Sequence, residues 1–255
     1  QAIPSFKNYG GESAYGQFEY KEIPTYRYFL DSMLGSEGQP RGENTFISFN
    51  YDTIVEDSLT SMEVGFTYGF DTKDVAYQTS RLKLDDSGIK LLKLHGSINW
   101  ARANYPDLSD EKLIVYDSYS ELLKQNTTPD LIPPTWRKNF DGGLETIWAH
   151  ALKAIESATR IIVIGFSVPE TDTHFKYLMA AGLQNNISAR DIIFVNPADD
   201  GILESRISTL FTNPESSRVR QIKKSTFDFL LSPNGFADQD CINSCGRGIH
   251  ISGRY

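Results

Sequence analysis

The chain has 255 residues, of which 40% are hydrophobic and 23% are charged, and its formal net charge at pH 7 is −8. This length suffices for one large domain or two small ones. The acidic balance argues against direct nucleic-acid binding, because neutralising phosphates requires clustered lysine and arginine. No apolar run approaches the ~20 residues that span a bilayer, and two cysteines exclude a disulfide-built scaffold. We therefore expect a cytoplasmic protein that does not contact a membrane.

The first part of the chain leads into a buried strand. Residues 1–22 show no hydrophobic period and are predicted to form a loop or mobile segment. The apolar spacing over 24–34 predicts a helix that opens on a proline. A buried strand is predicted over 45–49. It runs directly into the sequence Asn-Tyr-Asp at 50–52, before a helical segment at 53–59.

A second strand, predicted over 89–94, has the same kind of ending, because it leads into His95, Gly96 and Ser97. The alternating runs 63–70 and 75–84 lie between the two strands. Their turn signals predict an antiparallel excursion.

The region after the second strand is less regular. A short apolar run at 113–116 and a helical segment at 120–125 are its clearest features. We interpret 60–140 as containing a small inserted module, and 101–140 as the part that covers the site.

From residue 144 onward, helices and strands alternate regularly. Helices are predicted over 144–155, 172–183, 202–211 and 227–231, and strands over 160–165, 191–196 and 219–222. Alternation at this spacing implies right-handed crossovers and a parallel sheet. The predicted fold class is therefore α/β: a Rossmann-like parallel sheet with helices on both faces and a smaller inserted module. Residues 1–231 form the predicted main domain, and 232–255 a tail or a linker to a further domain.

Common catalytic and binding motifs are absent from the sequence. It contains no Walker A sequence, no Gly-x-Gly-x-x-Gly, no His-Glu-x-x-His and no Gly-x-Ser-x-Gly. Cys241 and Cys245, with His250 nearby, have the wrong spacing for a zinc ribbon. We therefore expect no metal site.

A set of polar residues remains, each at the carboxyl end of a predicted strand. These are Asn50 and Asp52, then His95, then Gly165 and Ser167, and finally Asn196. The carboxyl ends of parallel strands meet at one edge of an open sheet, where ligands bind. A glycine in such a turn lets the backbone approach a ligand closely, as in phosphate-binding turns. The pattern therefore predicts a ligand cleft at this edge.

Each of these residues also has a structural interpretation. Asn50 or Asp52 can cap the helix that follows them. His95 can be a hydrogen-bonded interior histidine, and Ser167 an ordinary turn residue. The residues alone leave both interpretations open.

Five short motifs resemble the sirtuin (SIR2) family, specifically its bacterial SIR2-like NAD-consuming domains. They occur in family order over about 45–225: Phe49-Asn50-Tyr51-Asp52, Leu94-His95-Gly96-Ser97, Leu131-Ile132-Pro133-Pro134-Thr135-Trp136, Gly165-Phe166-Ser167-Val168-Pro169 and Val195-Asn196-Pro197.

The resemblance implies a Rossmann-like site for NAD+ as substrate. Asn50 and Asp52 would face the nicotinamide ribose, and His95 would be the catalytic base. The implied cofactor-binding residues are Phe49, Gly96, Gly165, Ser167 and Asn196, the last three around phosphate and adenosine ribose.

The sequence departs from the family in two ways. The family's first strand and its Gly-Ala-Gly-x-Ser turn are not found upstream of Pro24, and the chain begins with Gln1 rather than methionine. We therefore expect the natural N-terminus to be missing. The zinc-binding cysteine pairs of the protein deacylases are also absent, which argues against peptide deacylation.

The predicted function is hydrolysis of NAD+ to nicotinamide and ADP-ribose. By resemblance, such domains serve bacterial anti-phage defence by abortive infection, and are activated by oligomerisation or by a partner domain. The alternatives are an NAD-dependent protein deacylase, an ADP-ribosyl transferase, or a non-catalytic module that binds NAD or ADP-ribose. The presence of both Asn50 and His95 favours catalysis, because a pure binder needs neither.

Overall fold

The computed structural model describes residues 24–34, 43–103, 112–131, 143–170, 172–198, 201–208, 210, 219–231 and 248–252. The helices within them are α2 (Pro24–Leu34), α3 (Ile54–Ser61), α4 (Tyr119–Lys124), α5 (Leu144–Ser157), α6 (Thr173–Gln184), α7 (Ile202–Ser208) and α8 (Thr226–Leu231). The strands are β1 (Asn44–Ser48), β2 (Phe66–Thr67), β3 (Val75–Gln78), β4 (Ile89–Lys93), β5 (Trp100–Ala103), β6 (Lys112–Tyr116), β7 (Arg160–Ile164), β8 (Asp191–Val195), β9 (Val219–Ile222) and β10 (Gly248–Ser252). Most of these segments were predicted from the sequence; β5 and β10 were not.

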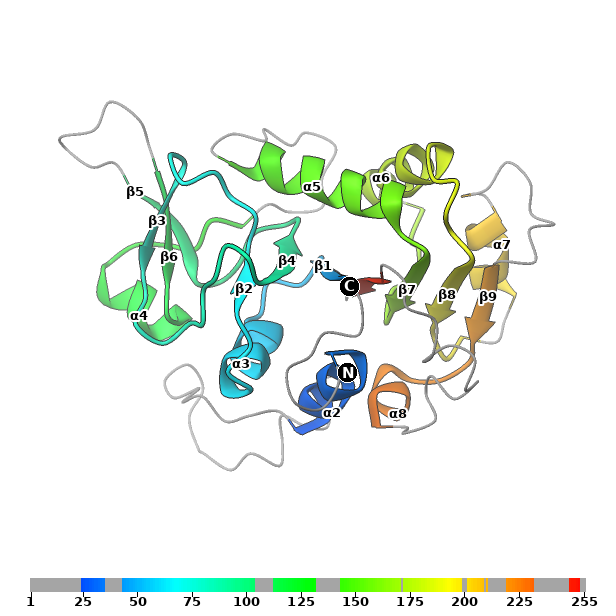
Figure 1. Ribbon diagram of the computed structural model, residues 1–255, viewed down its shortest axis with the longest axis horizontal. Helices are drawn as coiled ribbons and strands as arrows, with labels where there is room; N and C mark the ends of the chain where they lie inside the picture. Colours follow the sequence, from blue (N-terminus) through cyan, green and yellow to red (C-terminus); the bar gives the residue numbers. More distant parts are fainter. Residues whose placement is uncertain are drawn as a thin grey trace.

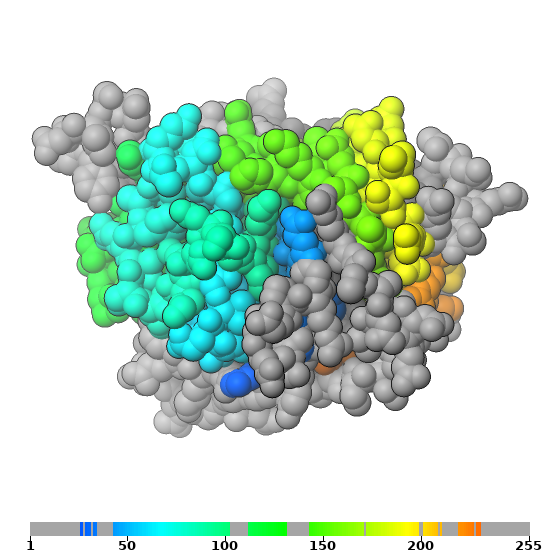
Figure 2. All heavy atoms as spheres, in the orientation of Figure 1, coloured from blue at the N-terminus to red at the C-terminus, as the bar shows by residue number. Residues whose placement is uncertain are grey.

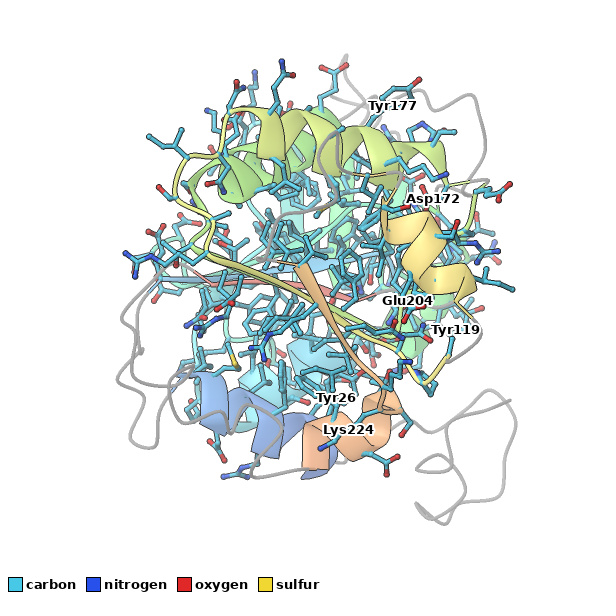
Figure 3. All side chains as sticks on the ribbon, turned by 90° about the vertical axis from the view of Figure 1, so that its right-hand side faces the viewer. Tyr26, Tyr119, Asp172, Tyr177, Glu204 and Lys224 are labelled. Atoms are coloured by element: carbon cyan, nitrogen blue, oxygen red, sulfur yellow. The ribbon has the colours of Figure 1, made fainter. Side chains whose placement is uncertain are left out.

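Seven of the described strands form one parallel sheet, in the order β2-β4-β1-β10-β7-β8-β9. Helices α5 and α6 cover one face, and α2, α3 and α8 cover the other (Figure 1). The side view shows the same layers, with Tyr177 of α6 pointing away from the sheet (Figure 3). This arrangement confirms the predicted Rossmann-like α/β fold with helices on both faces.

The residue types explain why these segments form a layered sheet. β7 and β8 read Arg-Ile-Ile-Val-Ile and Asp-Ile-Ile-Phe-Val, and all but the first residue of each is buried. Strands covered by helices on both faces require such continuous apolar runs. α5 buries Leu144, Ile147, Ala151 and Ile155, whose spacing of three or four residues makes one apolar stripe. The stripe and the strands together form the helix–sheet core.

Strand β10 lies in the middle of the main sheet, within the stretch 232–255 that was expected to form a tail or linker. It runs parallel to β1 on one side and to β7 on the other, and Ser252 aligns with both Ser48 and Ile164 (Figure 1). Both edges of β10 are therefore paired, as backbone groups in a sheet interior require. β10 joins the two halves of the sheet, β2-β4-β1 and β7-β8-β9. His250 belongs to this strand, whereas Cys241 and Cys245 lie outside the described residues.

A second, smaller sheet of three described strands has the order β3-β6-β5, with α4 packed beside it. Its side chains alternate. Trp100, Leu113 and Val115 join the main core, whereas Ala101 and Ile114 pack in a separate small cluster. In Figure 2 this module (cyan to green) gathers on one side of the visible face, and α6 and β8 (yellow) lie on the other.

The antiparallel excursion predicted over 63–70 and 75–84 is wrong. β2 pairs in parallel with β4, and β3 pairs in parallel with β6. The antiparallel pair of this region is β5 with β6. Alternation of apolar residues indicates a strand but carries no information about its partner, which explains the error.

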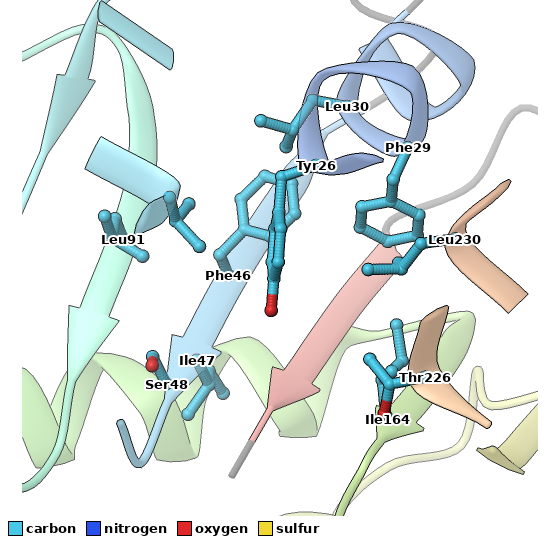
Figure 4. A pocket seen from close by; sticks show the side chains of 11 residues that line it. Tyr26, Phe29, Leu30, Phe46, Ile47, Ser48, Leu91, Ile164, Thr226 and Leu230 are labelled. Atoms are coloured by element: carbon cyan, nitrogen blue, oxygen red, sulfur yellow. The ribbon is translucent and has the colours of Figure 1, made fainter. Parts of the chain in front are cut away.

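A small cavity lies between α2, α8 and the sheet (Figure 4). Its volume is about 30 Å³, its lining is mainly apolar, and Tyr26 reaches into it from α2. Such a space has room for no more than about one or two water molecules, whereas ligand pockets occupy roughly 300 Å³ or more. The cavity is therefore a packing gap between helices and sheet, too small to be a ligand site.

Candidate functional site

The residues predicted from strand ends lie along one edge of the main sheet. Because its strands are parallel, the segments that follow β4, β1, β7 and β8 emerge at the same edge. In the strand order, His95 and Asn50 follow strands on one side of β10, and Gly165 and Asn196 follow strands on the other. The chain order reverses direction between β1 and β7, which is where open α/β sheets bind ligands.

The backbone fixes the segment at 50–52, which carries Asn50. The Asn50 N–H donates a hydrogen bond to Ser48 Oγ at 3.1 Å. The Tyr51 carbonyl accepts two hydrogen bonds, from the Ile98 N–H at 2.9 Å and from Ser97 Oγ at 3.2 Å. The segment after β1 is thus tied to the turn after β4, and Asn50 and His95 belong to one connected unit.

Asp52 has a structural role at the same corner. Its Oδ1 accepts a hydrogen bond from the Ile54 N–H at 3.2 Å, so its carboxylate caps the start of α3. This contact supports the capping interpretation raised from the sequence. Asp52 is half-buried at the strand end, and any role in charge stabilisation is additional to the cap.

His95 is almost completely buried, with 1% of its surface exposed. Its ring packs edge-on against Phe49, with ring centroids 5.1 Å apart, and the Tyr51 ring lies 6.2 Å away. The preceding carbonyl, of Leu94, accepts a hydrogen bond from the Trp148 indole N–H at 3.2 Å. These contacts orient the imidazole. The same burial also fits the interior-histidine interpretation of His95.

Gly96 permits the turn that follows His95. Its φ is +82°, and a Cβ at this position would lie 2.3 Å from the carbonyl oxygen of Asp130. A residue with a side chain fits neither the conformation nor the space. The turn thereby approaches Leu131, with which Gly96 forms an isolated bridge. The rest of the motif at 131–136 lies outside the described residues.

Replacing Gly96 with alanine is expected to destabilise the protein by about 2–4 kcal/mol, because the methyl group meets both an unfavourable φ and a backbone oxygen. Gly201→Ala is a matched control: φ is +72°, but the nearest atom, Glu204 Oε2, lies 3.6 Å from the added Cβ. The control should cost only about 1–2 kcal/mol. Urea unfolding of both variants tests the difference, and equal losses would contradict the close contact at Gly96.

A cluster of aromatic rings bridges the two halves of the site. Phe49, after β1, stacks on Phe166, after β7, with centroids 5.6 Å apart. Phe175 of α6 packs against both, at 5.9 Å from Phe49 and 4.5 Å from Phe166. All three side chains are buried. Phe49, expected among the cofactor-binding residues, thus also packs against His95 and links it to Phe166.

The turn after β7 has an unusual backbone. Gly165 has φ +70°, and its N–H donates to the Val195 carbonyl at 3.0 Å. Val168 is buried and has φ +49°, a conformation that β-branched residues rarely adopt. Such strain, on the order of 1–3 kcal/mol, tends to occur at functional sites. Ser167 between them is exposed.

Asn196 braces this turn from the neighbouring strand. Its Nδ2 donates to the Phe166 carbonyl at 3.4 Å, and its Oδ1 accepts from the Ala198 N–H at 2.9 Å. The carbonyl of Ser167 accepts from Arg206 Nη1 at 3.2 Å. The segments after β7 and β8 therefore form a second connected unit, which the Phe49–Phe166 stack joins to the first.

A buried charged network behind Asn50 was not predicted. Lys93 Nζ lies 2.9 Å from Glu56 Oε1, and each side chain is 1% exposed. The Tyr68 hydroxyl donates to the same Glu56 oxygen at 3.3 Å, and Lys93 also donates to the carbonyl of Asp52. A lysine in the apolar strand 89–94 was the available signal, because lysine is almost never fully buried without a partner.

Other parts of the described structure offer weaker sites. A surface hollow of about 500 Å³, lined in part by Ile187 and Arg190, lies at the amino ends of β7 and β8, which is the wrong edge for a Rossmann-type ligand. The described residues contain no cluster of His, Cys, Asp or Glu that could hold a metal ion. Each helix among them is too short or too polar to cross a bilayer.

Comparison with known families decides the assignment. The model of the SIR2-like domain matches residues 44–216, which include every strand end described above. The chain belongs to the SIR2-like domain family. SIR2-like domains are NAD-utilising enzymes. No curated protein matches the chain. β10 lies beyond the matched range, although it stands in the middle of the SIR2-like sheet.

Proposed function

We propose that this protein hydrolyses the bond between nicotinamide and ribose in NAD+, giving nicotinamide and ADP-ribose. The observation that carries the proposal is the pair of hydrogen bonds from Ser97 and Ile98 to the Tyr51 carbonyl. They tie the segment that bears Asn50 to the turn that bears His95. An amide and an imidazole on two segments that are hydrogen-bonded to each other, at the carboxyl edge of a SIR2-like sheet, suit this reaction.

The chemistry assigns a distinct task to each group. The C–N bond breaks as nicotinamide leaves with the electron pair, and positive charge develops on the ribose. Water forms the new C–O bond, and His95 accepts a proton from that water or from a ribose hydroxyl. Asn50 positions the water or the ribose. The Asp52 carboxylate, besides its cap, stabilises the developing cation.

The second unit of the site suits the rest of the dinucleotide. Gly165, which has a positive φ and no side chain, forms the turn at the end of β7, and Ser167 is exposed nearby. Such a turn can approach a phosphate closely. We propose that Gly165 and Ser167 lie against phosphate and that Asn196, through its brace to the Phe166 carbonyl, holds this turn near the adenosine ribose.

The biological role in this proposal is anti-phage defence by NAD+ depletion, triggered by oligomerisation or by a partner. A protein deacylase, an ADP-ribosyl transferase and a non-catalytic NAD-binding module are the alternatives. The absence of the deacylases' zinc-binding cysteine pairs from the sequence weighs against the deacylase.

Incubation of the full-length natural protein with NAD+ tests the proposal. Chromatography should detect nicotinamide and ADP-ribose in equal amounts, and the Asn50→Ala variant should form both at least about a hundredfold more slowly. Nicotinamide that appears only with an acylated peptide would support the deacylase instead, and ADP-ribose attached to protein would support the transferase. If the protein binds NAD+ but does not cleave it, in both dilute and concentrated oligomeric samples, the non-catalytic NAD-binding module would be the supported function.

A further inference from the structure

Packing alone does not explain the buried charges behind the site. Moving two charges out of water costs several kcal/mol, and apolar residues replace many buried ion pairs without loss of stability. Burial raises the pKa of Glu56, although the Lys93 ammonium acts to lower it. Burial, and then the charge of Glu56, raise the pKa of Tyr68 well above its usual value. A network that is costly to bury needs a role that apolar side chains cannot fill.

The ammonium group of Lys93 contacts more than Glu56. It also donates a hydrogen bond to the backbone carbonyl of Asp52. Asp52 is the residue after Tyr51, and the Tyr51 carbonyl accepts the hydrogen bonds from Ser97 and Ile98 in the turn after His95. Lys93 ends β4, where it aligns with Ser48, the residue that accepts the Asn50 N–H. The carboxyl end of β4 therefore contacts the 50–52 segment twice, through the Lys93 ammonium at the Asp52 carbonyl and through the turn after His95 at the Tyr51 carbonyl.

We infer that Lys93 is a positioning residue: its ammonium sets the backbone of the 50–52 segment and thereby the placement of Asn50 relative to His95. Glu56 holds the ammonium in place through the ion pair, whereas the Tyr68 hydroxyl donates to Glu56 and not to the Asp52 carbonyl. An apolar side chain of equal length would fill the space but could not donate to a carbonyl. The Lys93 ammonium contacts Glu56 and the Asp52 carbonyl, so its effect on the site passes through the backbone.

The inference rests on the proposed NAD+ hydrolysis and deepens it. A displacement of about 1 Å in a positioned group can lower a catalytic rate roughly a hundredfold. We therefore expect loss of the lysine to lower kcat more than it raises KM, because binding of NAD+ also uses the distant Gly165 turn. Backbone protection at Ile98 should fall as well, since its N–H depends on the position of the Tyr51 carbonyl.

The experiment compares the wild-type protein with Lys93→Met/Glu56→Gln, which removes both charges and keeps an acceptor for Tyr68. Kinetics of NAD+ cleavage and amide hydrogen exchange at Asn50 and Ile98 are measured on each. The double variant should fold, lose at least about tenfold in kcat, and exchange at least about tenfold faster at Ile98. Tyr68→Phe is the matched control: it removes a hydroxyl from the cluster but leaves the Lys93–Asp52 contact, so both readouts should stay near wild type.

Several outcomes would overturn the inference. The first is a double variant whose kcat or whose exchange at Ile98 is unchanged. The second is a Tyr68→Phe variant that loses as much in both readouts as the double variant. The third is a double variant that does not fold at 25 °C, which would make the network structural. Glu56→Gln alone keeps the lysine and should retain more activity than the double variant; an equal loss would also count against it. If wild-type protein does not cleave NAD+, the proposed function fails, but hydrogen exchange at Ile98 still tests whether Lys93 positions the segment.

Discussion

Replacement of His95 with alanine is expected to lower the rate of NAD+ cleavage by about 10²–10⁴-fold, the usual contribution of a general base. The ring packs against Phe49 and is almost fully buried, so alanine also leaves a cavity. His95→Gln, which fills more of this space but is not a base at neutral pH, should lose activity to a similar extent with less loss of stability. Initial rates and thermal melts of both variants separate the two effects.

His150→Ala provides the control for that experiment, because His150 belongs to α5 and not to a strand end. It should cleave NAD+ at nearly the wild-type rate. Retention of more than about a tenth of wild-type activity in both His95 variants would contradict the base assignment and favour the interior-histidine interpretation.

Asp52→Asn refines the same experiment. The amide oxygen of asparagine can still accept from the Ile54 N–H, so the cap on α3 is kept while the negative charge is removed. A fall in kcat of about tenfold or more would support charge stabilisation at the ribose. An unchanged kcat would leave Asp52 as a helix cap alone.

The edge of the sheet was predictable because its signals are local. Continuous β-branched runs such as 160–164 indicate strands buried on both faces, and the polar residue that ends each run needs no knowledge of the partner strand. Parallel order then brings Asn50, His95 and Gly165 to one edge by topology. The SIR2-like family assignment agrees with that reading of the sequence.

The unpredicted features depend on contacts between distant residues. Lys93 and Glu56 are separated by 37 positions, and nothing in the spacing of either indicates that they pair. The same holds for the Phe49–Phe166 stack, which joins residues 117 positions apart. β10 was missed for a related reason: Gly-Ile-His-Ile-Ser is a short alternating run in a polar stretch, and only its two neighbours make it a central strand.

A chain that ends at residue 247, and so lacks β10, is expected to lose most of its stability. β10 forms parallel ladders with β1 and β7 along its whole length. Each lost backbone hydrogen bond costs about 0.5–1.5 kcal/mol, and the unpaired groups of two inner strands would be left behind. The sum approaches the 5–15 kcal/mol that stabilises a typical domain. Urea unfolding should show a midpoint far below that of the 255-residue chain, or no cooperative transition.

The position of β10 makes this loss reversible in principle, which provides the decisive control. A peptide of residues 247–253 supplies the same ladder partners to β1 and β7 without a covalent connection, in the manner of strand addition to an open sheet. Added in excess, it should raise the unfolding midpoint of the shortened chain, whereas a peptide with Ile249 and Ile251 replaced by proline should not, because proline cannot donate to a ladder. Full stability of the shortened chain without peptide would contradict a central β10. In that case the two halves of the sheet, with Asn50 and His95 on one side and Gly165 and Asn196 on the other, would have to be joined by other contacts such as the Phe49–Phe166 stack.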